Sequence, residues 1–184
     1  MMDRNKLGML LFVASESVFF MLLIGAYVSF RSTGGTGPTA ANSLDPIKTG
    51  IFSVCLFSSS LTMWLAELNR KRSKRAWVSF WLLATVVLGT IFLIGQGSEY
   101  AHLLRENVTI SRDLFGTTFF TMTGFHGMHV FGGLAMLVVL LGLSLRGSDQ
   151  DPSFSSMESV AIYWHFVDAV WVVIFSIVYL WGFL

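Results

Sequence analysis

The sequence has little charge, little proline and almost no cysteine, and each shortage excludes a class of protein. Only 12% of its 184 residues are charged and 54% are hydrophobic, whereas an ordinary soluble domain is about 25% charged. A water-soluble enzyme is therefore excluded first. The single Cys55 excludes an internal disulfide, a cysteine-built zinc site and an iron–sulfur cluster. The net charge of +1 provides no global basic field, so a nucleic-acid partner is not predicted.

Long apolar runs dominate what remains. A bilayer core about 30 Å thick requires roughly 20 helical residues, and five runs reach that length, at residues 7–30, 47–68, 77–103, 116–145 and 156–183. All three prolines, Pro38, Pro46 and Pro152, fall between these runs. Backbone groups in lipid must form hydrogen bonds within their own segment, which favours helices. The sequence therefore predicts an all-α, polytopic membrane bundle with five transmembrane helices, residues 1–184 forming a single membrane domain.

The basic residues predict how the bundle is oriented. Residues 69–75 form the one strongly basic run and join the second and third spans. With five spans, this run shares a side with the N-terminus, and that side carries eight of the twelve Lys and Arg residues. The positive-inside rule then predicts a cytoplasmic N-terminus and a C-terminus on the outside. Orientation accounts for the run, although a site for anionic lipid or nucleic acid is the alternative.

Ionisable residues at membrane depth are costly, so each one predicts a partner or a function. Glu16 lies near the middle of the first span, among apolar side chains. It is interpreted either as a neutral acid hydrogen-bonded to a neighbouring helix, or as part of a proton relay or a lipid-headgroup site. Gln96, Glu99 and His102 are expected to form a smaller polar group near the outer end of the third span.

The remaining histidines raise the possibility of haem or metal ligation. His126 and His129 leave one helix in similar directions, so they cannot clamp opposite faces of one haem. A di-histidine haem would need one of them together with His165, and no second pair remains. No cluster of Cys, Met or carboxylates completes a copper or di-iron set. We therefore predict that these histidines form interhelical hydrogen bonds and that the chain binds no metal.

The fifth span has two unlike faces. A polar or small stripe, expected to face a protein bundle or cleft, contains Glu158, Ala161, His165, Asp168, Val172, Ser176 and Tyr179. The bulky residues Trp164, Trp171, Phe175 and Val178 fall elsewhere and are expected to meet lipid. His165 and Asp168 are three residues apart and are predicted to form a hydrogen bond along the helix.

Four patches of sequence resemble subunit III of the haem–copper terminal oxidases, the cytochrome c oxidase family. In family order they are MLLFVASE at 9–16, GQGSEY at 95–100, TGFHGMH at 123–129 and YWHFVDAVW at 163–171. Glu16 matches the family's buried membrane glutamate. Five more residues fall in the recurring patches: Glu99, His126, His129, His165 and Asp168. From the resemblance we expect Glu16, His126 and His165 to be the lipid-binding residues.

The resemblance also implies a function and a setting. Family members are helical subunits beside the catalytic subunit I and hold phospholipid in a cleft, while haem and copper belong to partner subunits. Oxidase subunits I and II, phospholipid and a larger respiratory supercomplex are therefore the expected partners, in a complex that reduces oxygen and pumps protons. The long family form has seven spans and this sequence begins at what would be the third, which favours a bacterial plasma membrane.

Two alternatives stay open at this point. The chain could be an accessory subunit of a related quinol oxidase or nitric oxide reductase, because the electron donor and the gas substrate are chosen on other chains. A free-standing proton channel would instead use Glu16 and Asp168 as a relay.

Overall fold

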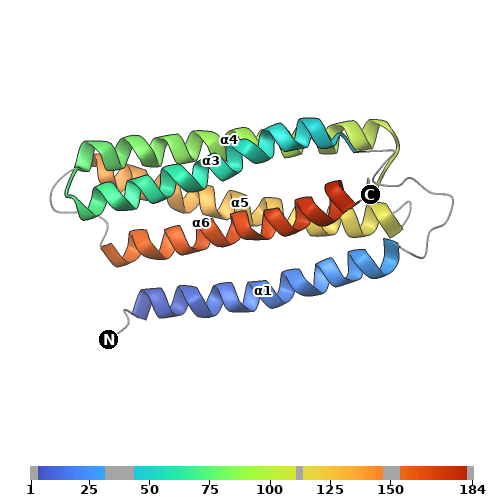
Figure 1. Ribbon diagram of the computed structural model, residues 1–184, viewed down its shortest axis with the longest axis horizontal. Helices are drawn as coiled ribbons and strands as arrows, with labels where there is room; N and C mark the ends of the chain where they lie inside the picture. Colours follow the sequence, from blue (N-terminus) through green and yellow to red (C-terminus); the bar gives the residue numbers. More distant parts are fainter. Residues whose placement is uncertain (1–3, 32–43, 111–113, 147–153, 182–184) are drawn as a thin grey trace.

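Five long helices run side by side in alternating directions (Figure 1). The computed structural model describes residues 4–31, 44–110, 114–146 and 154–181. The helices are α1 (Arg4–Arg31), α3 (Pro46–Lys71), α4 (Arg75–Arg105), α5 (Leu114–Arg146) and α6 (Phe154–Phe175), and a π-helical turn, η2 (Ser176–Leu180), continues α6. Within the described ranges no residue forms a strand. All five helices are long and apolar enough to cross a membrane, which confirms the predicted all-α bundle with five spans.

The start of α3 shows why one proline lies inside a helix rather than between spans. Pro46 is the first residue of α3, a position at which a backbone N–H would lack an intrahelical acceptor in any case. The side chain of Asp45 caps the helix by accepting hydrogen bonds from the N–H groups of Ile47, at 3.1 Å, and Lys48, at 3.0 Å. The helix therefore begins one residue earlier than the predicted span. The last predicted span ends at residues 182–183, which lie outside the described part.

α6 lies against three other helices, α1, α3 and α5, and its bulky face is buried. Trp164 and Trp171 are 0% and 1% exposed, so the prediction that this face meets lipid is wrong. The indole N–H of Trp164 donates to Ser59 Oγ at 3.0 Å, and that of Trp171 donates to Ser53 Oγ at 2.8 Å. Conversely, Val172, from the stripe predicted to face inward, is 47% exposed.

Two glycines make room for the Trp164 ring. A Cβ atom added to Gly89 of α4 would lie 2.8 Å from Trp164 Cη2, and one added to Gly133 of α5 would lie 2.7 Å from Trp164 Cε3. Both distances are too short for a real contact. The indole therefore fills space that only glycine leaves open on the two facing helices, and this brings α4, α5 and α6 together.

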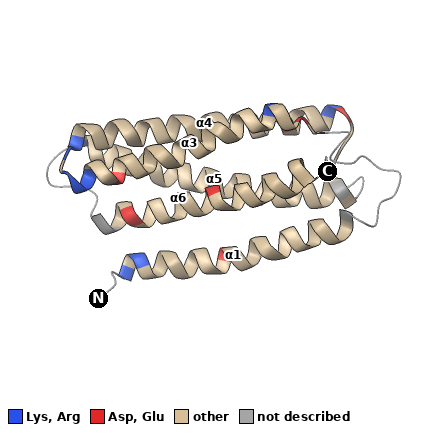
Figure 2. Cartoon of the chain, viewed as in Figure 1, with Lys and Arg blue, Asp and Glu red and all other residues tan. Residues whose placement is uncertain are grey.

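The Lys and Arg residues lie near the ends of the helices, whereas α1 and α6 each carry an acidic residue near mid-length (Figure 2). The basic N-terminal end of α1 and the basic turn between α3 and α4 lie at the same end of the bundle, as an odd number of spans requires. Which side of the membrane this end faces stays a prediction, as does the assignment of residues 1–184 to a single domain.

Candidate functional site

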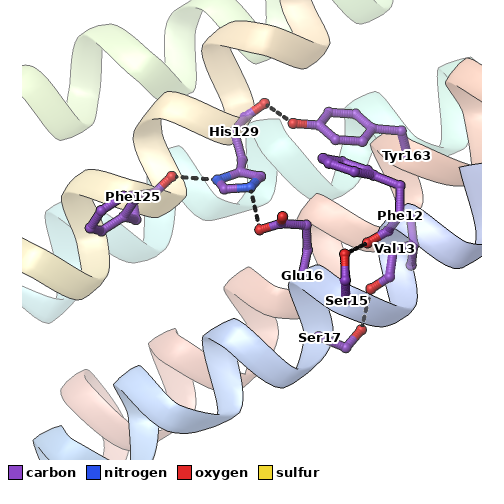
Figure 3. A network of polar contacts seen from close by, with 8 residues as sticks. All are labelled: Phe12, Val13, Ser15, Glu16, Ser17, Phe125, His129 and Tyr163. Atoms are coloured by element: carbon purple, nitrogen blue, oxygen red, sulfur yellow. Dashed lines mark hydrogen bonds and ion pairs between the residues drawn. The ribbon is translucent and has the colours of Figure 1, made fainter.

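Glu16 of α1 and His129 of α5 form a polar pair between two helices (Figure 3). His129 Nε2 lies 3.1 Å from Glu16 Oε2, and His129 Nδ1 lies 2.7 Å from the carbonyl oxygen of Phe125. A carbonyl only accepts hydrogen bonds, so Nδ1 must carry the proton in that contact. Nε2 and the carboxyl group then share one further proton.

Aromatic side chains surround this pair without enclosing it. The hydroxyl of Tyr163 donates to the carbonyl oxygen of His129 at 3.0 Å, and the rings of Phe12 and Tyr163 stack at 6.1 Å. The ring of Phe20 meets that of His129 edge-on at 5.1 Å. The side chains of His129 and Glu16 remain 15% and 22% exposed. The pair therefore lies at the margin of the contact among α1, α5 and α6, within reach of the surrounding medium.

His126, one turn before His129 on α5, is in a different environment. It is 0% exposed, and neither ring nitrogen has a hydrogen-bond partner among the described residues. Its ring stacks on Trp171, with centroids 4.9 Å apart and planes at 22°, and meets Phe20 and Phe92 edge-on. The predicted interhelical hydrogen bond is therefore wrong for His126. Its buried position also keeps it away from any surface of this chain that lipid could reach.

A second polar cluster joins α3 to α6. The hydroxyl of Ser60 donates to Asp168 Oδ2 and lies 3.0 Å from His165 Nδ1. Because the hydroxyl has a single proton, His165 Nδ1–H must donate to Ser60 while Ser60 donates to Asp168. His165 and Asp168 thus meet through Ser60 rather than directly, which corrects the predicted bond along α6. Asp168 Oδ1 is buried and has no hydrogen-bond partner among the described residues.

A third cluster surrounds Glu99 of α4. Thr49 donates to one carboxyl oxygen of Glu99 at 2.7 Å, and Tyr179 of η2 donates to the other at 2.6 Å. Gln96 donates separately to the carbonyl oxygen of Thr123 at 2.7 Å. His102 is not part of this group: its side chain is 52% exposed and lies 3.5 Å from Glu106, one turn further along. The polar group predicted from Gln96, Glu99 and His102 is therefore wrong with respect to His102.

Sequence reasoning missed the small polar residues that join α3 to α4 and α6. They are Thr49, Ser53, Ser59 and Ser60, and all four bind α4 or α6 through their hydroxyl groups. Thr49, Ser53 and Ser60 recur at spacings of four and seven residues along one apolar helix, and this was the available signal, because it indicates a face that meets protein rather than lipid.

The three clusters remain separate from one another. Among residues 4–31, 44–110, 114–146 and 154–181, no three His, Cys, Asp or Glu side chains converge where a metal ion could bind. The ionisable side chains of these clusters are held by hydrogen bonds across helices, and His126 is held by aromatic rings of neighbouring helices. This arrangement defines a multi-pass membrane protein whose buried polar groups join its helices to one another.

Comparison with known proteins gives the family. Residues 1–183 match the family described as cytochrome c oxidase subunit III. Two bacterial proteins named cytochrome c oxidase subunit 3 are each 36% identical to this chain. The relative from Synechocystis sp. aligns over 97% of this chain and 76% of its own length, and that from Corynebacterium diphtheriae over 95% and 86%. A Mus musculus protein of the same name is 34% identical over 96% of this chain and 69% of its own. The chain belongs to the cytochrome c oxidase subunit III family.

Proposed function

We propose that this chain is the non-catalytic subunit III of a haem–copper terminal oxidase, a respiratory oxidoreductase complex. The observation that carries the proposal is the family match over residues 1–183, nearly the whole sequence. The relatives cited above are named as subunits of cytochrome c oxidase, so an accessory role in a quinol oxidase or nitric oxide reductase is not favoured. Five apolar helices make the chain a multi-pass membrane protein.

The proposed partners are oxidase subunits I and II, which would carry the haem and copper of the complex. Support comes from α1, whose outward face is apolar and exposed: Leu11, Met21 and Leu22 are 65%, 62% and 70% exposed. Such a face needs either lipid tails or the helices of another subunit. Membership of a larger supercomplex is a further part of the proposal. Among the relatives, those from bacteria support a bacterial plasma membrane as the location.

Phospholipid is the ligand we propose for the α1 face. Glu16 is the most suitable of the predicted lipid-binding residues, because its side chain is 22% exposed and lies on the helix with the open face. Half-buried His165 is held by Ser60, and His126 is enclosed by aromatic rings. Of the three residues, Glu16 therefore provides the main support for a lipid-organising role.

Affinity purification of the chain from its native membranes in mild detergent tests the proposal. We expect two larger subunits to co-purify in equal amounts, with haem absorbance and copper in the particle. The same chain produced alone should show no haem absorbance. Stoichiometric haem on the isolated chain, lost on substitution of His129 or His165, would contradict the non-catalytic assignment. A particle without haem or copper would contradict membership of an oxidase.

A further inference from the structure

The turn between α3 and α4 encloses a basic pocket that the proposed function does not use. The pocket has a volume of about 420 Å³, within the range of about 300–1,000 Å³ that small-ligand sites occupy. It is lined by Arg70, Ser73, Lys74, Arg75, Val78 and Ser144. Three of these residues are cations, two carry hydroxyl groups and, of the described residues that line it, none is acidic. From the sequence alone, the basic run at residues 69–75 was interpreted as an orientation signal. The structure adds a concave pocket in which hydrogen-bond donors come from α3, α4 and α5.

Backbone geometry shapes the pocket. Ser73 adopts a left-handed conformation, with φ of 55°, and its N–H donates to the carbonyl oxygen of Arg70 at 3.0 Å. This tight turn brings the end of α3 close to the start of α4. Lys74 is the N-cap residue of α4 and makes no side-chain capping bond. The N-terminus of α4 thus lies at the pocket together with the C-terminal ends of α3 and α5, whose partial charges are of the opposite sign. The positive potential of the pocket therefore comes from its side-chain cations.

Exposed aromatic and apolar side chains lie beside the pocket. Trp77 lies between the pocket residues Arg75 and Val78, is 53% exposed and packs against Phe80 and Trp81 in an aromatic cluster. Such clusters are typical of the membrane–water interface. On α5, Leu145 beside the pocket residue Ser144 is 68% exposed. Cations at the end of the bundle (Figure 2) thus stand just above an apolar band.

We propose that this pocket binds a phosphate group, supplied by the headgroup of an anionic phospholipid. Arg70, Lys74 and Arg75 provide charge, and Ser73 provides a hydroxyl donor. Val78 provides an apolar wall toward the membrane. A zwitterionic headgroup fits less well, because its own cation would lie among the cations of the pocket. This site is separate from Glu16 and the open face of α1.

Native mass spectrometry of the full chain in detergent, titrated with phosphatidylglycerol or phosphatidylcholine, tests the site. We expect phosphatidylglycerol to bind more tightly. Lys74→Gln should weaken it about fivefold and Lys74→Gln with Arg75→Gln about twentyfold or more, from the usual contribution of one cation near an anionic surface. Lys74 is exposed, so we expect Lys74→Gln to fold normally. This single variant therefore still tests the site if the double variant fails to fold. The charge-matched control is Arg4→Gln with Arg72→Gln, two exposed cations outside the pocket.

Each other outcome has a definite meaning. Equal losses in both double variants would show general surface attraction and overturn the proposal. Displacement of the lipid by inorganic phosphate, but not by chloride at the same ionic strength, would support the phosphate site and assign its ligand to solution. The segment between α5 and α6 contains Asp149 and Asp151. If lipid binds only after Asp149→Asn with Asp151→Asn, the chain's own acids are the occupant and the proposal is wrong.

Discussion

α1 and α6 are both apolar enough to cross a membrane, yet they are buried to very different extents. In the most apolar 18-residue stretch of α1, the mean hydropathy is 2.2 and 6% of the residues are buried. In the corresponding stretch of α6 and η2, the mean hydropathy is 1.8 and 44% of the residues are buried. Two stretches that are both strongly apolar therefore differ about sevenfold in the share of their residues that is buried. Lipid tails are as apolar as leucine, so hydropathy drives a helix out of water without deciding whether protein or lipid covers it.

What distinguishes the two helices is the kind of contact each makes. α6 has two fully buried tryptophans, each of which donates a hydrogen bond to a serine of α3. α1 is joined to α5 and α6 by the Glu16–His129 pair, by a Lys6–Glu158 ion pair and by ring contacts such as Phe19 with Phe125. α6 is packed on several sides, whereas α1 packs through one face, with Phe20 and Tyr27 buried, and leaves its other face exposed.

The largest expected effect is in the close-packed region, at Gly133. Gly133→Ala places a methyl group against the fully buried ring of Trp164. Overpacking of this kind costs about 1–3 kcal/mol, which the better helix propensity of alanine offsets only in part. Gly142→Ala on the same helix is the control, because nothing lies within 4 Å of its added Cβ.

We expect the unfolding free energy to fall for Gly133→Ala and to stay unchanged or rise slightly for Gly142→Ala. The measurement is an SDS titration of the purified chain in mixed micelles, followed by tryptophan fluorescence. Equal effects of the two substitutions would mean that Trp164 does not hold α5 and α6 together, and the contrast between α6 and α1 would lose its basis.

A smaller effect is expected for the pair that attaches α1. Glu16→Leu leaves His129 Nε2 without its partner, which we expect to cost about 1 kcal/mol because the site is only partly exposed. Glu16→Gln keeps a hydrogen-bonding group of nearly the same size and should cost less. Hydrogen exchange should show faster exchange in α1 for the leucine variant, with α4 and α6 unchanged.

The glutamine variant also separates attachment from catalysis. In the assembled oxidase we expect Glu16→Gln to retain most oxygen consumption, since the chain is proposed to be non-catalytic. Loss of oxygen reduction in a correctly assembled complex would contradict that assignment. Loss of assembly in both variants would instead show that α1 depends on the ionisable group itself.

Much of the fold could be predicted because it follows from bilayer thickness. The five spans needed only apolar length, and the location of the basic turn beside the N-terminus followed from their odd number. The burial of Trp164 could not be found in this way, because it depends on Gly89 and Gly133 in two other helices. A helical wheel of one span shows two faces but does not show which one has a glycine-lined neighbour.

The candidate site was predictable only as a set of residue types. Costly ionisable groups at membrane depth predicted that Glu16 and Asp168 have special surroundings. Their partners, His129 and Ser60, depend on how the helices are rotated about their axes. For His126, the expectation of a hydrogen bond failed because aromatic rings from three helices fill the space around it.

The smallest effect is expected for the ion pair at the N-terminal end of α1. Lys6 Nζ lies 2.5 Å from Glu158 Oε1, but the two side chains are 33% and 30% exposed. Water and salt screen such a pair, which typically contributes between zero and about 1 kcal/mol. A double-mutant cycle of Lys6→Met and Glu158→Gln should give a coupling of about 0.5 kcal/mol that falls as salt rises. Arg4→Gln replaces Lys6→Met in the control cycle and should give none. A salt-independent coupling well above 1 kcal/mol would mean that this end of α1 is fixed as firmly as α6, and the difference between the two helices would then be one of packing alone.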